Sequence, residues 1–174
     1  GALAPRSVDA FHLLGMAQLL QKAYQPAVFA LRTALRLSPE RVDSMVSLGA
    51  ALAELEQLDE ALSWHEKAVA AAPDDAAAHA ALAVTLRRRL DSVGSIAACR
   101  RTLELTPNRT DIWLLLGSNL GAAGRFQEAE ACYRKALSLN PDSAEARRDL
   151  ATIGRQAADP DEIGLLRSTL DNQA

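Results

Sequence analysis

The sequence is poor in aromatic residues, which occupy 4% of its 174 positions, although 49% of the residues are hydrophobic. An interior with so few rings must be filled largely by alanine and leucine. These residues, like arginine and glutamate, favour helices, whereas strands favour β-branched and aromatic side chains. The scarcity of aromatics therefore argues against a sheet and predicts an all-α protein.

Cysteine is also scarce, since the chain contains only Cys99 and Cys132. Two cysteines are too few for the disulfide framework of a small secreted domain or for a cysteine-rich metal cluster. No apolar run approaches the roughly 18 residues that a membrane-spanning helix needs, and no secretory signal is apparent. We therefore expect no membrane partner, no metal and a cytoplasmic location.

The chain has no excess of positive charge. Its formal net charge is −3 at pH 7, whereas nucleic-acid-binding domains usually carry a strongly basic patch. The charge balance therefore predicts no nucleic-acid partner. Arginine far outnumbers lysine alongside abundant alanine, which is typical of GC-rich bacterial genomes, so we expect a bacterial source.

Five prolines recur at a spacing of 34 residues: Pro5, Pro39, Pro73, Pro107 and Pro141. With each proline at position 32 of a 34-residue unit, the chain divides into four repeats, at 8–41, 42–75, 76–109 and 110–143. A degenerate fifth unit follows at 144–171. Self-similarity at this period indicates stacked supersecondary units, so we expect one repeat domain over residues 1–174.

Other columns of the repeat agree as well as the proline does. Position 7 is always leucine, position 8 is glycine or alanine, and positions 20 and 27 carry small residues. Apolar positions 4, 7, 8 and 11 have helical spacing, and the small residues allow close helix packing. The proline ends a helix, because the residue before it avoids the α region. Each unit is therefore predicted to be a pair of helices of roughly 13 residues.

The columns W/F-x2-L-G at positions 4–8, alanine at 20, an aromatic at 24, alanine at 27 and proline at 32 resemble the tetratricopeptide repeat. Repeat 4 is nearly complete, with Trp113, Leu116, Gly117, Gly124, Phe126, Ala129, Tyr133, Ala136 and Pro141. Repeats 2 and 3 depart from the pattern, with His65 and Cys99 at position 24. The resemblance covers about residues 3–151 and implies a right-handed superhelical solenoid of antiparallel helix pairs.

Both ends of the chain depart from complete repeats. Residues 1–7 are in register with the end of a preceding unit, so we expect the tail of a truncated upstream repeat. The uncovered face of repeat 1 would then invite end-to-end self-association. Near the other end, Asp159 and Pro160 have the features of a helix start, and apolar residues follow at helical spacing. We expect a C-terminal capping helix there.

No arrangement of residues in the sequence indicates catalysis. The histidines His12, His65 and His79 fall at three different repeat positions, and the partner histidine of a zinc-protease helix is missing. His65 and His79 occupy core columns, which favours a structural role. Cys99 and Cys132 lie in second helices, where cysteine acts as a small buried hydrophobe. We therefore predict no enzymatic activity, no metal and no cofactor.

The family resemblance implies a concave groove lined by the first helix of each unit, at positions 2, 5, 9, 12 and 13. Positions 5 and 9 form a mostly apolar floor, and our candidates there are His12, Met16, Val46, Ala50, Val84, Leu114 and Ser118. Such a floor suits the apolar face of a helix or an extended peptide. The alternative is packing between neighbouring first helices, most of all for Ala50 and Ala80, whereas Met16 and Leu114 are expected to be exposed.

Charged residues could form the rim of this groove. Asp9, Asp43 and Asp111 share position 2, where each could attract a basic ligand or complement the positive end of a helix dipole. Arg87 and Arg88, at positions 12 and 13, could reach an acidic, sulfated or phosphorylated group. Repeat 2 is rich in aspartate and glutamate, and repeat 3 is rich in arginine. Alternatively, this acidic block and this basic block pair across the interface between the two repeats or stay solvated.

These features predict a non-catalytic scaffold that binds a protein or peptide in an apolar groove. A looser resemblance implies an alternative. A repeat array followed by a segment such as residues 159–167 (DPDEIGLLR) is similar to bacterial proteins in which these repeats precede a sulfotransferase domain. In that case the chain would position a substrate for a sulfotransferase- or glycosyltransferase-type domain that lies outside it.

Overall fold

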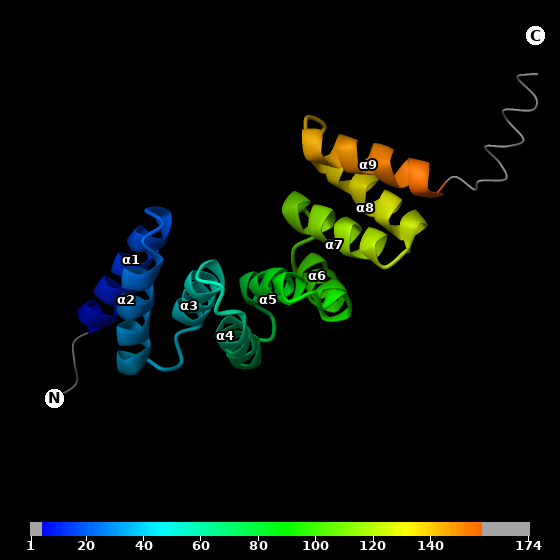
Figure 1. Cartoon of the computed structure of the whole chain (residues 1–174). Helices are drawn as coiled ribbons and strands as arrows, with labels where there is room; N and C mark the ends of the chain where they lie inside the picture. Colours follow the sequence, from blue (N-terminus) through cyan, green and yellow to red (C-terminus); the bar gives the residue numbers. More distant parts are fainter. Residues whose placement is uncertain (1–4, 158–174) are drawn as a thin grey trace, which may run out of the picture. The chain divides into compact units, whose positions relative to one another are not determined.

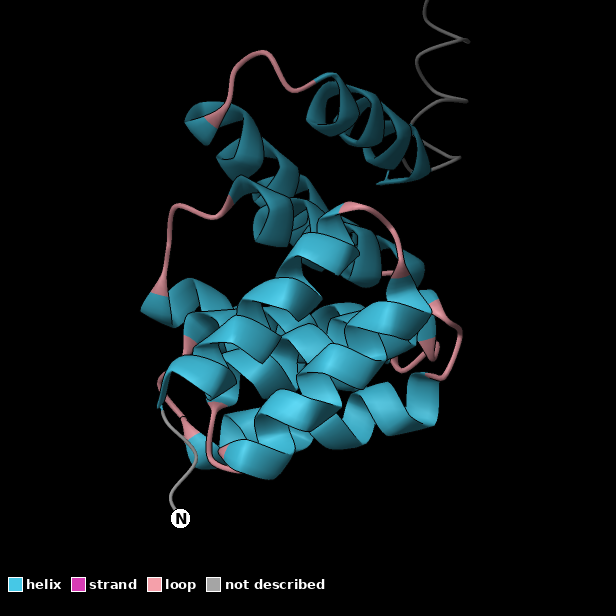
Figure 2. Ribbon diagram, turned by 90° about the vertical axis from the view of Figure 1, so that its left-hand side faces the viewer, coloured by secondary structure: helices cyan, strands magenta, loops and turns pink. Residues whose placement is uncertain are grey.

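The computed structural model describes residues 5–157, and over these residues the chain forms only helices and loops (Figure 2). The prediction of an all-α fold of repeated helix pairs is therefore confirmed. In chain order (Figure 1), the helices are α1 (Pro5–Leu20), α2 (Tyr24–Leu37), α3 (Val42–Glu54), α4 (Leu58–Ala71), α5 (Ala76–Arg88), α6 (Ser92–Leu105), α7 (Thr110–Ala122), α8 (Phe126–Leu139) and α9 (Ala144–Ala157).

Each complete repeat is a hairpin of two helices, and its turn has the same backbone in every copy. The turn residue at position 15 has a positive φ in all four: Lys22 (58°), Glu56 (59°), Leu90 (64°) and Gly124 (74°). The next N–H donates back to a carbonyl five residues earlier, as from Gln57 to Leu52 at 2.9 Å. This is the Schellman ending of a helix, which reverses the chain within three residues.

The second helix of each repeat ends just before its proline, as predicted. Helix α2 ends at Leu37 and α8 ends at Leu139, each two residues before a proline. Some first turns are also capped by side chains. The carboxylate of Asp75 accepts hydrogen bonds from the backbone N–H groups of Ala77 and Ala78, at 2.7 and 3.2 Å. The proline column therefore marks the end of each second helix, whereas the cap at Asp75 is not general, because the arginines at the equivalent position before α3 and α7 make no such hydrogen bond.

The chain divides into two compact units, Gly1–Pro107 and Asn108–Ala174. Helices α1 to α6 belong to the first unit, and α7 to α9 belong to the second. The core of the first unit is made of small and aliphatic side chains, among them Ala27, Leu31, Leu48, Leu52 and Ala61. The assignment of one domain to residues 1–174 stays a prediction.

The ends of the described region meet the sequence-based expectations only in part. Residues 5–7 form the first turn of α1, a position that favours Pro5. Their assignment to a truncated upstream repeat stays a prediction, and residues 1–4 lie outside the described part. Helix α9 lies where the first helix of the degenerate unit is expected. The predicted capping helix from Asp159 onward lies outside the described residues.

Leucine at position 7 is not always a core residue, contrary to expectation. Leu48 is fully buried, but Leu14 is 47% exposed. The reason is the neighbour on that side. In the first unit, α3 packs against α2 of the preceding repeat, whereas the described part contains no helix before α1.

Candidate functional site

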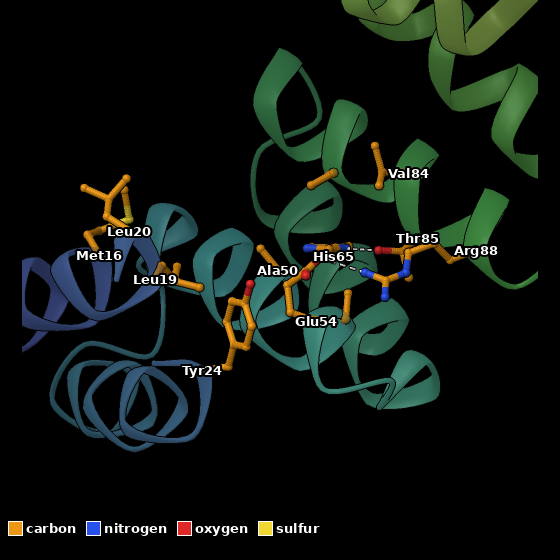
Figure 3. Close-up of a pocket in the computed structure, with 12 residues that line it drawn as sticks. Met16, Leu19, Leu20, Tyr24, Ala50, Glu54, His65, Val84, Thr85 and Arg88 are labelled. Atoms are coloured by element: carbon orange, nitrogen blue, oxygen red, sulfur yellow. Dashed lines mark hydrogen bonds and ion pairs between the residues drawn. The ribbon is translucent and has the colours of Figure 1, made fainter. Parts of the chain in front are cut away.

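A pocket of about 460 Å³ lies in the first unit, among the first helices α1, α3 and α5 (Figure 3). We call it the groove pocket. Its lining residues are Met16, Leu19, Leu20, Tyr24, Ala50, Ala53, Glu54, His65, Ala81, Val84, Thr85 and Arg88. Most of them are apolar, so the pocket offers a hydrophobic concave surface of the size that ligands occupy.

Large apolar side chains stand on opposite sides of the groove pocket (Figure 3). On α1, Met16 is 39% exposed and Leu20 is 84% exposed, and on α5, Val84 is 46% exposed. Helix α3 lies between them and contributes Ala50 and Ala53. Apolar surface grouped in this way usually marks a site of interaction rather than a random exposure.

His65 closes the pocket from below and joins three helices. Its Nε2–H donates to the carbonyl of Val46 on α3 at 3.2 Å, and its Nδ1 accepts from the hydroxyl of Thr85 on α5 at 2.9 Å. Burial lowers the pKa of the imidazole, although the Val46 carbonyl opposes this shift. His65 is therefore neutral at pH 7, and both of its nitrogens are occupied.

The space for His65 is provided by Gly49. A Cβ atom at Gly49 would lie 2.3 Å from His65 Nε2, so no larger residue fits there. The side chain is 1% exposed, which agrees with the structural role expected for it. His79 is half-buried, and its Nε2 lies 2.9 Å from the carbonyl oxygen of Pro73.

An ion cluster lies at one edge of the groove pocket. Arg88 Nη1 donates to Glu54 at 2.8 Å (Figure 3), and Arg88 Nη2 donates to Glu56 at 2.7 Å. Burial alone would lower the pKa of Arg88, but the hydrogen bonds and charges of the two carboxylates raise it above its ordinary value. Arg88 therefore pairs with repeat 2 and does not project freely toward an acidic ligand.

The pairing of Arg88 belongs to a wider pattern between the acidic repeat 2 and the basic repeat 3. Arg89 contacts Asp59 at 2.7 Å, and Arg101 contacts Asp74 at 2.6 Å. Of the two alternatives for these blocks, pairing across the repeat interface is therefore realised for several residues. Arg87 is exposed and does not line the groove pocket.

His12 was expected on the groove floor, and this expectation is wrong. The side chain is buried, and its Nδ1 lies 3.0 Å from Ser44 Oγ on α3. Burial first, and the charge of Arg41 second, lower the pKa of His12. Position 5 faces the neighbouring first helix here, which is the packing alternative. Val46 is likewise half-buried and does not line the pocket.

The aspartates at position 2 meet arginines of this chain. Asp9 pairs with Arg41, and Asp111 accepts two hydrogen bonds from Arg109, at 2.8 and 2.6 Å. These hydrogen bonds lower the pKa of Asp111, although burial opposes the shift. All three carboxylates are exposed, and the charges of Asp9 and Asp111 are already balanced by arginines of this chain.

Two further candidates lie in the second unit. Leu114 and Ser118 belong to α7, where both are half-buried rather than open to solvent. Ser118 lines a separate pocket of about 260 Å³, together with residues such as Tyr133 and Ile153. These two candidates therefore do not contribute to the groove pocket.

Met16, Ala50, Val84 and Arg88 are the sequence candidates that line the groove pocket. Sequence reasoning missed a larger group, consisting of Leu19, Leu20, Tyr24, Ala53, Glu54, Ala81 and Thr85. Leu19 and Leu20 occupy repeat positions 12 and 13, which supplied candidates only from repeat 3. Considering these two positions in every repeat would have identified both leucines. Within residues 5–157, no helix is both long and apolar enough to cross a membrane, and no cluster of His, Cys, Asp or Glu could hold a metal ion.

Stacked helical hairpins with an apolar pocket among their first helices define a helical repeat protein. Three family models, each described as tetratricopeptide repeat, match residues 8–41, 27–76 and 110–153. Together they span more than half of the chain. The protein therefore belongs to the tetratricopeptide repeat family, whose fold supports protein–protein interaction scaffolds.

Solved structures of such proteins share the fold. One described as MamA protein has a TM-score of 0.81 and 18% identity, over 97% of this chain and 92% of that one. Another, described as YrrB, a TPR protein with an unusual peptide-binding site, has a TM-score of 0.72 and 22% identity, over 82% of this chain and 73% of that one. At these identities the likeness establishes the fold alone.

A curated relative matches over a shorter region. The peroxisomal targeting signal receptor of Kluyveromyces lactis is 40% identical over 62 residues, which are 35% of this chain and 11% of that protein. The chain therefore spans only a small part of the receptor's length. The receptor's name indicates that it recognises targeting signals, and this recognition is a property of the receptor.

Proposed function

We propose that this protein is a scaffold that holds a peptide or helix of a partner protein in the groove pocket, and that the chain itself binds rather than catalyses. The observation that carries the proposal is the apolar pocket flanked by the exposed side chains of Met16, Leu20 and Val84. Docking an apolar peptide face there would remove these side chains from water, which is favourable. The peptide-binding site named for one structural relative supports this assignment.

The proposal is tested with a variant that places charge on both sides of the pocket. Met16→Glu combined with Val84→Glu should abolish capture of partner proteins from a lysate of the source organism, because burying an unpaired carboxylate is costly. Leu90→Glu with Val93→Glu is the matched control. It introduces the same charge at side chains that are 89% and 81% exposed and lie outside the pocket.

Circular dichroism would establish that both variants stay folded. A partner captured by the wild type and by the control, but not by the pocket variant, supports the proposal. A partner retained by the pocket variant would contradict it and assign binding to another surface.

Self-association and a role beside a transferase domain are further predictions. Self-association would use the outer face of α1, where Leu14 is exposed, and light scattering over a dilution series with Leu14→Glu tests it. A constant monomer mass would exclude it. The transferase alternative depends on residues 159–167, outside the described part, and no observation within that part favours it. The cytoplasmic location and bacterial source also remain predictions.

A further inference from the structure

We propose that the groove pocket selects its ligand through one bulky apolar side chain, with a lysine or arginine close to it in the ligand sequence. This inference rests on the proposed function and specifies the chemistry of the partner. Three features carry it: the shape of the pocket above α3, the apolar character of most of its lining, and the charge at its edge.

The shape follows from a size difference between neighbouring repeats. In column 9, Ala50 of α3 stands between Met16 of α1 and Val84 of α5, and all three residues line the pocket. The middle repeat therefore carries a methyl group where both neighbours carry longer side chains. Helix α3 thus forms the low centre of the pocket.

The imidazole at the base of the pocket has no free hydrogen-bonding group to offer. His65 is occupied on both ring nitrogens, by Thr85 and by the carbonyl of Val46. The sulfur of Met16 accepts from Ser47 Oγ at 3.1 Å. A polar ligand group inserted there would lose its water without gaining a partner, which costs free energy. Because most of the other lining residues are apolar, the pocket favours an apolar group, and a bulky side chain gains most from filling the space.

The edge of the pocket determines which charge the ligand carries. Arg88 is shared by Glu54 and Glu56, so this cluster of two carboxylates and one guanidinium has a net charge of −1. The side chain of Arg88 is 28% exposed, compared with 47% for Glu54 and 75% for Glu56. An approaching ligand therefore meets carboxylates first, which attract a lysine or arginine and repel an acidic residue.

A display library of random peptides of about 12 residues, selected against the purified full chain, tests this inference. Ala50→Leu fills the low centre of the pocket, and Ala97→Leu makes the same change at an exposed alanine of α6, outside the pocket. Selected peptides should share one leucine, methionine or aromatic residue with a lysine or arginine within a helical turn of it. Their affinity should fall about tenfold or more in Ala50→Leu and stay unchanged in Ala97→Leu.

The charge at the edge has its own variant. Glu54→Gln combined with Glu56→Gln should weaken the same peptides several-fold and reduce the salt dependence of their binding. Peptides that bind the double variant as tightly as the wild type, or that carry acidic residues beside the anchor, would overturn the basic requirement.

The selected peptides also separate this inference from the function on which it rests. If they are lost in Met16→Glu with Val84→Glu but tolerate Ala50→Leu, the single anchor is overturned and the groove remains a binding site. If they tolerate both changes, the proposed function fails as well. Selection of no peptide would overturn both.

Discussion

The hairpins α3–α4 and α7–α8 are built on the same frame but hold different rings at the centre. In α3–α4 the imidazole of His65 lies against Gly49, and in α7–α8 the phenol ring of Tyr133 lies against Gly117. Both rings are buried, at 1% and 3% exposure. The repeat therefore constrains the size of the side chain that packs on the glycine, whereas the polarity of that side chain can vary.

The other two repeats obey the same size rule with different residues. In repeat 1, a Cβ atom at Gly15 would lie 2.5 Å from Cγ of Leu31. In repeat 3, Ala83 replaces the glycine, and the smaller Cys99 replaces the large side chain, with both residues fully buried. A larger residue on one helix is thus matched by a smaller one on the other, as close packing requires.

Replacing the glycine by leucine breaks this match and should have the largest effect. The nearest ring atoms would lie 2.3 Å from a Cβ at Gly49 and 2.8 Å from one at Gly117. Because both rings are rigid and buried, Gly49→Leu and Gly117→Leu should each cost about 3 kcal/mol or more. Urea denaturation followed by fluorescence measures the loss, with Trp64 reporting on α4 and Trp113 on α7. An unchanged midpoint would contradict the packing of that hairpin.

A double-mutant cycle separates size from other effects of these substitutions. Gly49→Ala combined with His65→Cys reproduces the Ala83 and Cys99 pair of repeat 3. The double variant should lose less stability than the sum of the two single variants, because the smaller thiol vacates the space that the new methyl group needs. Additive losses would mean that the two side chains do not compete for that space.

The helical frame is predictable from the sequence because each repeat carries its own signals in fixed columns. Proline ends the second helix, and the size match between columns 8 and 24 fixes the hairpin. Leu14 marks the limit of this reasoning. Column 7 predicts a core leucine, but burial also requires a helix packed on that face, and no column of the same repeat encodes that neighbour.

The candidate site is predictable only in part. Columns 9 and 13 identify Met16, Val84 and Arg88, but the depth of the pocket comes from a size difference between adjacent repeats. The pairing of Arg88 with carboxylates more than 30 residues away depends on how two repeats stack. His12 was misassigned for a similar reason, because its column faces either the groove or the next helix.

The second prediction uses the different polarity of the two rings. Because burial lowers the pKa of His65, the unfolded state binds a proton more readily than the folded state below about pH 6.5. Stability should therefore be full well above that pH and fall as the solution is acidified below it. All three histidines belong to the first unit, so the loss should appear in the Trp64 signal and not in the Trp113 signal.

His65→Tyr, which inserts the ring of the second unit, is the control for this prediction. It should reduce the pH dependence reported by Trp64, and the remainder belongs to His12, whose pKa is also lowered by burial. A pH dependence as steep as that of the wild type would show that protonation of His65 is not the cause.

The smallest expected effect concerns the turns of the two units. Leu90 lies in the turn after α5 with φ at 64° and is 89% exposed, whereas Gly124 lies in the turn after α7 with φ at 74° and has no atom near its missing Cβ. The left-handed conformation costs a leucine about 1–2 kcal/mol. A glycine avoids this cost, but the greater freedom of its unfolded chain lowers the free energy of unfolding by about 0.5–1 kcal/mol. Leu90→Gly should therefore raise the free energy of unfolding by roughly 0.5–1 kcal/mol, and Gly124→Leu should lower it by a similar amount. Urea denaturation of the two variants measures both changes. A loss of stability in Leu90→Gly would mean that this leucine stabilises the turn through contacts that outweigh its backbone strain.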